Sequence, residues 1–164
     1  MTDSVATINT VISEHHATRL HIRLAGDSIS DEEAVATLKA ARTDWIPGRL
    51  AALGLRRRKL EQTLCYLREG LSNHFAAEET LLPLLLDQVL TRAIVLDHRR
   101  ILESMDEALA AVADLDLQGP DRESLLAMDS KVQQLIDHVC HLIEDHATKE
   151  DIVLDMMLRA LREE

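Results

Sequence analysis

The chain has 164 residues, which suffices for one domain with a substantial core but not for two independent ones. Hydrophobic residues make up 46% of it and aromatic residues only 2%, so the core must consist of aliphatic side chains, which favours helices over sheets. The formal net charge of −11 argues against binding to nucleic-acid phosphates or to anionic lipid, because Lys and Arg are not in excess.

Neither the amino terminus nor the cysteines indicate a secreted or membrane protein. Asp3 stands where a signal peptide would carry basic residues, and the longest apolar block, Leu81 to Leu86, is broken by Pro83. Cys65 and Cys140 form no CxxC pair, so free thiols are expected. We therefore expect no signal peptide, no membrane span and a cytoplasmic location.

The first predicted helix spans Ser4 to Leu24, where apolar residues recur at helical spacing, and it ends at Gly26. The pattern Ser30-Asp31-Glu32-Glu33 has the form of a capping box, so a short helix is expected from there to about Ala41. Three longer amphipathic segments follow, and helices are predicted at about Leu55–Leu86, Thr91–Leu115 and Asp121–Leu161.

Two prolines affect where these predicted helices end or begin. Pro83 should bend or loosen the end of the second long helix, and Gly119-Pro120 separates the third from the fourth. Four amphipathic helices with short connections pack most simply as a bundle. The predicted fold is therefore all-α, an antiparallel up-down-up-down four-helix bundle forming one domain over residues 1–164, with the short helix inserted between the first two long ones.

The second and fourth long helices repeat each other when one is shifted by 72 positions, which places His74 on His146 and Glu78 on Glu150. Their apolar positions coincide as well. In the second helix, the predicted buried stripe consists of Leu60, Leu64, Leu67, Leu71, His74, Glu78, Leu81 and Leu85. In the fourth helix, it consists of Val132, Ile136, Val139, Ile143, His146, Glu150, Val153 and Met157.

A His and a Glu four residues apart lie on one face of a helix, and here that face is the apolar one. Ionisable groups in an aliphatic interior carry a large desolvation cost unless they are paired or bound to metal. Neutral imidazole and carboxylate are both good metal ligands, and a carboxylate can bridge two cations. The repeat therefore predicts a site for two metal ions, with a metal-free network of His and Glu pairs as the structural alternative.

The first and third helices can supply further imidazoles. A shift of 83 positions aligns Glu14-His15 with Asp97-His98 and keeps most apolar positions in register. We prefer His15 to His16, because the register that uses His16 places polar residues where the third helix is apolar, but the sequence leaves His16 as the alternative.

The ordered set His15, His74-x-x-x-Glu78, His98 and His146-x-x-x-Glu150 resembles the hemerythrin-like family, also called the HHE cation-binding domain, over nearly the whole chain. The resemblance implies a four-helix bundle around a non-haem di-iron centre with an oxo or hydroxo bridge. The ligands that it implies are His15, His74, Glu78, His98, His146 and Glu150. Zinc or manganese could replace iron, because they accept the same donors.

Two positions depart from the oxygen-carrying members of that family. A further His one turn after the third-helix ligand is replaced by Leu102, which implies fewer imidazoles and more open coordination positions. An acid five positions after the last His would be Asp151, but we choose Glu150, because it repeats the spacing of Glu78 and stays on the apolar stripe.

The leading functional hypothesis is a di-iron protein that binds O2, NO or a related oxidant, in sensing, detoxification or iron handling. The alternatives are an enzyme acting on peroxide or NO, or repairing iron-sulfur clusters, and a metal-free helical interaction module. A ferritin-like oxidase is disfavoured, because that class uses Glu-x-x-His. Homo-oligomers are compatible with the sequence. The remaining histidines are predicted to face solvent, namely His16, His21, His138 and His141.

Overall fold

The computed structural model describes residues 28–45, 53–115 and 121–162, and nearly all of this part is helical. Its elements are α2 (Asp31–Asp44), α3 (Leu53–Leu81), the 3₁₀ helix η2 (Leu82–Leu84), α4 (Gln88–Ala113) and α5 (Arg122–Arg162). These residues contain no β-strand, so the predicted all-α class is confirmed. The helix predicted over Ser4–Leu24 lies outside the described residues.

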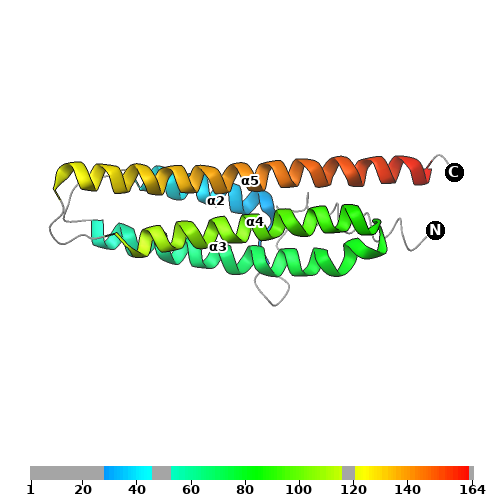
Figure 1. Cartoon of the computed structure of the whole chain (residues 1–164), viewed down its shortest axis with the longest axis horizontal. Helices are drawn as coiled ribbons and strands as arrows, with labels where there is room; N and C mark the ends of the chain where they lie inside the picture. Colours follow the sequence, from blue (N-terminus) through cyan, green and yellow to red (C-terminus); the bar gives the residue numbers. More distant parts are fainter. Residues whose placement is uncertain (1–27, 46–52, 116–120, 163–164) are drawn as a thin grey trace.

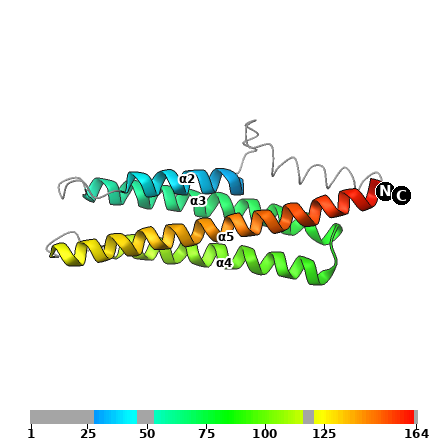
Figure 2. The same cartoon turned by 90° about the horizontal axis from the view of Figure 1, so that it is seen from above.

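The four α-helices lie side by side along the long axis, and successive helices run in opposite directions (Figure 1). Both α4 and α2 pack against α3 and α5, so the four helices surround a common interior. α2 is the shortest and lies beside only one half of α5 (Figure 2). It covers the range of the predicted short helix and continues to Asp44. The up-down-up-down order of a bundle that includes residues 4–24 stays a prediction.

Local chemistry explains where these helices begin and end. The Ser30 hydroxyl accepts a hydrogen bond from the backbone N–H of Glu33 at 3.1 Å, as the capping box predicted. α4 begins at Gln88, before the predicted start at Thr91, because the Asp87 side chain caps it. α3 ends at Leu81, and the chain tightens into η2 around Pro83, which cannot donate an amide hydrogen bond.

Buried aliphatic side chains form two clusters along the bundle. The larger one includes Leu64, Leu71, Ile101 and Ile143, and the smaller one consists of Leu82, Leu86 and Ile94. The predicted stripes of the two repeated helices are correct up to Glu78 and Glu150. The two clusters therefore lie on either side of the predicted site.

Beyond those two glutamates the predicted stripes are wrong, and in the same way in both helices. The residues predicted to be buried there are only partly buried, namely Leu81, Leu85, Val153 and Met157. The residues one position later are buried instead, namely Leu82, Leu86, Leu154 and Leu158. In α5 the buried positions after Glu150 follow at two successive steps of four residues, so the contact face shifts around the helix. In the other segment α3 has already ended at Leu81, and the change to η2 at Pro83 turns Leu82 and Leu86 inward.

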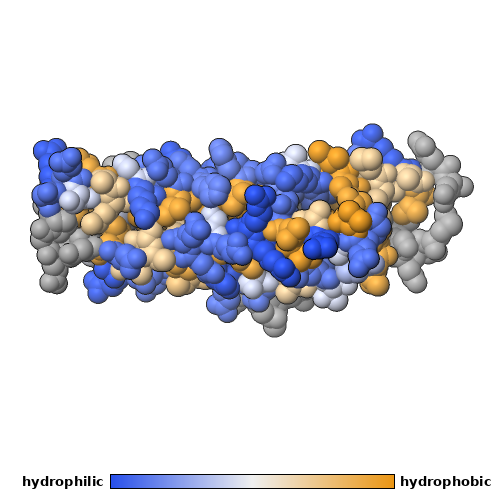
Figure 3. All heavy atoms as spheres, in the orientation of Figure 1, coloured by the Kyte–Doolittle hydropathy of each residue, from blue (hydrophilic) through white to orange (hydrophobic). Residues whose placement is uncertain are grey.

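The face shown in Figure 3 is mostly hydrophilic, and hydrophobic side chains gather on it toward the end where α3 passes into α4. Ion pairs between exposed side chains, Lys39 with Glu144 and Arg42 with Asp137, join α2 to α5. Such exposed pairs stabilise little, and α2 also buries Ala34 and Leu38 against the bundle. Among the described helices, none is long and apolar enough to cross a membrane.

Candidate metal centre

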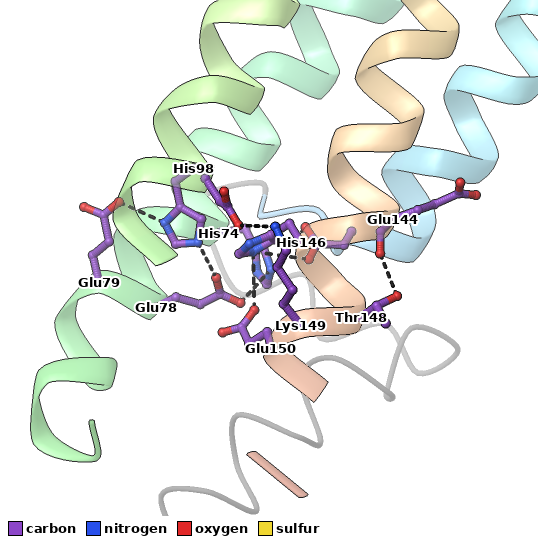
Figure 4. A network of polar contacts seen from close by, with 11 residues as sticks. His74, Glu78, Glu79, His98, Glu144, His146, Thr148, Lys149 and Glu150 are labelled. Atoms are coloured by element: carbon purple, nitrogen blue, oxygen red, sulfur yellow. Dashed lines mark hydrogen bonds and ion pairs between the residues drawn. The ribbon is translucent and has the colours of Figure 1, made fainter. Parts of the chain in front are cut away.

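The structure brings together the five predicted site residues that lie in its described part. His74 and Glu78 come from α3, His98 from α4, and His146 and Glu150 from α5. Each is at most 5% exposed. Figure 4 shows their side chains converging between the helices. The sixth predicted ligand, His15, and its alternative, His16, lie outside the described residues.

The Glu78 carboxylate lies between imidazoles of two different helices. Its Oε1 is 2.9 Å from Nε2 of His74, and its Oε2 is 3.2 Å from Nε2 of His98. The repeated pair on α5 is similar, with 3.4 Å between His146 Nε2 and Glu150 Oε2. A carboxylate that directs its two oxygens toward separate imidazoles is arranged as a bridging ligand would be.

Two overlapping groups of buried side chains could each hold a cation. One consists of Glu78, His98 and His146, and the other of Asp31, His146 and Glu150. In each group, one ligand atom from every residue lies within 4.8 Å of the others. Both groups use His146, and an imidazole nitrogen binds only one ion, so the groups mark two neighbouring positions at which a cation could lie.

Asp31 is the residue of this site that sequence reasoning missed. It is the first residue of α2 and is 3% exposed, with Oδ1 3.7 Å from His74 Nε2 and Oδ2 3.9 Å from His146 Nε2. Its neighbours Glu32 and Glu33 are exposed. In the sequence all three are acids in the first turn of a helix, which is a common pattern, so nothing there distinguished the buried one.

The ring of His98 is held from two sides by residues that the sequence analysis did not single out. Its Nδ1 is 2.9 Å from Oε1 of Glu79, so a protonated Nδ1 donates a hydrogen bond to that carboxylate. Phe75 stacks on the ring, with centroids 4.1 Å apart and planes 7° from parallel. The Phe75 ring is also T-shaped relative to that of His146, with centroids 5.6 Å apart. With the proton on Nδ1, His98 directs an unprotonated Nε2 toward Glu78, which is the tautomer that a metal ligand needs.

The electrostatics of the centre favour positive charge inside it. Burial alone would lower the pKa of His146, but Glu150, Asp31 and Glu78 together outweigh this and raise it. The same negative charges that favour a proton on that imidazole would favour a metal ion beside it. With apolar clusters on both sides, little water is available to screen the carboxylates.

Other residues considered from the sequence belong to neither of the two groups. His138 and His141 are exposed, as predicted. Leu102 is partly buried and packs against the larger apolar cluster. Asp151 is partly buried and belongs to neither cation-binding group, whereas Glu150 is 1% exposed and lies within one of them.

Comparison with known protein families agrees with this geometry. The family profile of the hemerythrin HHE cation binding domain matches residues 6–156. The chain belongs to this family. No match was found among curated proteins or among solved structures.

The donors present fit the cation binding that defines this hemerythrin family. Three imidazoles and three carboxylates are buried together, between two clusters of apolar side chains. Nitrogen and oxygen donors of this kind suit iron, manganese and zinc, and they lack the thiolates that would favour softer ions. The ligand chemistry is therefore consistent with the family, and it does not by itself select one metal.

Proposed function

We propose that this hemerythrin-family protein holds two iron ions at the buried centre and binds a small oxidant there, O2, NO or peroxide. The observation that carries the proposal is the Glu78 carboxylate, buried between His74 and His98 with one oxygen toward each. A dry interior tolerates this concentration of ionisable groups when cations compensate it. Iron would supply the redox-active position at which the oxidant binds.

Each repeated pair would contribute one imidazole and one carboxylate. His74 with Glu78, and His146 with Glu150, lie on adjacent turns of α3 and α5, so the two helices present matching donors across the bundle. His98 from α4 and His15 from the amino-terminal segment complete the proposed set. Glu79 positions His98 rather than binding metal, because its contact is with Nδ1, the nitrogen that faces away from Glu78.

The composition of the set supports ligand binding at an open position. Leu102 stands one turn after His98, at the sequence position where the oxygen-carrying members of the family have a further imidazole, so this chain offers one donor fewer there. An incomplete set of protein donors leaves a position for a small molecule. We infer that the protein serves sensing, detoxification or iron handling.

The proposal is tested by measuring metal content and absorption of protein produced with added iron, first after anaerobic reduction and then after exposure to air or NO. About two irons per chain, with absorption bands that change on exposure, are the expected result. The combined substitution H74A and H146A should abolish iron binding. The control H138A removes an exposed imidazole from α5 and should leave iron binding unchanged.

The same experiment decides between metal binding and the metal-free alternative. A folded wild-type protein that takes up no iron, and whose stability is unaffected by chelators or by the two His substitutions, would refute the proposed function. The remaining hypothesis would then be a metal-free helical interaction module. Catalytic loss of peroxide or NO by the iron-loaded protein would extend the proposal to an enzyme.

A further inference from the structure

The geometry points to Asp31 as an additional metal ligand, a third carboxylate contributed by α2. This inference rests on the proposed metal-binding function, because it concerns the same buried centre. It goes beyond the repeated His and Glu pairs, in which Asp31 has no part. Three observations carry it: the burial of the side chain, its distances to two imidazoles and the charge of the site.

Burial separates Asp31 from the other acids of its helix. It is 3% exposed, whereas Glu32 and Glu33, which follow it in the same turn, are exposed. An exposed Asp would serve the amino terminus of a helix equally well, and the cap is already supplied by Ser30. Burying a carboxylate costs free energy that capping does not require, and here the burial places the carboxylate beside the imidazoles of His74 and His146.

The distances fit two ligands of one ion better than a direct hydrogen bond. The Asp31 oxygens lie 3.7 Å from His74 Nε2 and 3.9 Å from His146 Nε2, beyond hydrogen-bond range. With metal–ligand bonds of about 2.1 Å, two ligands of one ion are about 3.0 Å apart at a right angle and about 4.2 Å apart when opposite. Both measured distances fall within that range, and the two imidazoles come from different helices.

Charge gives Asp31 a role that neutral residues could not fill. Two divalent cations held only by Glu78 and Glu150 would leave an uncompensated positive charge in an aliphatic interior. A third carboxylate reduces that charge by one unit. It also makes the site richer in oxygen donors, which favours harder cations such as iron and manganese over softer ones.

The test compares the substitutions D31N and E33Q in the full chain. Both remove one negative charge from the first turn of α2, but only the first removes it from the buried centre. We expect D31N to bind Fe²⁺ at least about 10-fold more weakly in anaerobic competition with a chromophoric chelator, or to retain one ion per chain in place of two. E33Q should match the wild type in both measurements.

The outcomes separate this inference from the proposed function. Wild-type protein that binds no iron would refute the proposed function. Wild-type and D31N proteins that both bind two ions with equal affinity would refute the role of Asp31 alone. As a control, circular dichroism is measured for each variant to test whether it is folded.

If D31N does not fold, the substitution D31E tests instead whether Asp31 coordinates the ion. The longer side chain keeps the charge but moves the carboxylate oxygens, so the visible absorption of the Co²⁺-loaded protein should change if the residue coordinates the ion. A spectrum and Co²⁺ affinity identical to those of the wild type and E33Q would overturn the assignment.

Discussion

The contact between Glu79 and His98 offers a quantitative test of how the metal centre is positioned. Glu79 Oε1 lies 2.9 Å from Nδ1 of His98, and Phe75 stacks on the same imidazole. The Glu79 side chain is 40% exposed, so its hydrogen bond is partly screened by water. Removing it should therefore affect metal binding through the orientation and basicity of the ring, with little effect on the stability of the metal-free protein.

Two substitutions at this position separate charge from geometry. E79Q keeps a carbonyl oxygen that can accept the hydrogen bond, whereas E79A removes the acceptor. Partners of metal-binding histidines typically contribute 10- to 100-fold in metal affinity. Given the exposure of Glu79, we expect E79A to weaken metal binding about 10-fold, which corresponds to about 1.4 kcal/mol, and E79Q to weaken it less.

The assay is anaerobic competition for Fe²⁺ between the protein and a chromophoric chelator, with thermal unfolding of the metal-free protein measured in parallel. E69Q is the matched control, because Glu69 is an exposed acid on the same helix. Affinities of E79A and E69Q that agree within a factor of two would refute the positioning role. The positioning role would also be refuted if the loss of Fe²⁺ affinity in E79A were explained by unfolding of the metal-free protein.

Three further predictions concern stability and reactivity. L64A, at a fully buried position, should lower the free energy of unfolding by about 2–5 kcal/mol in urea denaturation. Burial raises the pKa of the Cys140 thiol to about 11, so a thiol reagent at pH 8 should modify the exposed Cys65 before Cys140. Mass spectrometry measures the two rates of modification, and equal rates would contradict the prediction. A hydrogen bond from Arg68 lowers the pKa of Asp106, so the pair stabilises the fold above the ordinary Asp pKa and stops doing so as the pH falls through the lowered value. D106N should therefore cost at most about 1 kcal/mol at pH 7, and its difference from the wild type in denaturation curves should shrink below about pH 4.

The internal repeat made much of the centre predictable. His74, Glu78, His146 and Glu150 lie at matching positions of two long helices, and helical periodicity alone places each pair on one face. The register between the third helix and the amino-terminal segment added His98. The structure brings these five residues together, and their role as metal ligands stays a proposal.

Residues whose importance depends on tertiary packing could not be found in this way. Phe75 and Glu79 flank predicted ligands in sequence, but only the approach of α4 brings them to His98. Asp31 belongs to a short helix whose place in the bundle the sequence does not specify, and its pattern indicates capping. The repeat reveals only the features that α3 and α5 have in common, and the contacts of Phe75, Glu79 and Asp31 are not among them.

Asp31 also makes the two halves of the centre chemically different. Within the described residues, the group around Glu78 contains two imidazoles and one carboxylate, whereas the group around Glu150 contains one imidazole and two carboxylates. In the second group, Asp31 occupies the role that His98 has in the first. If ions lie at both positions, His146 can bind only one of them, and in either case the position beside Asp31 has more oxygen donors and should favour the harder cation. Stepwise metal titration of the wild type should therefore show two unequal sites, and D31N should weaken one of them more than the other.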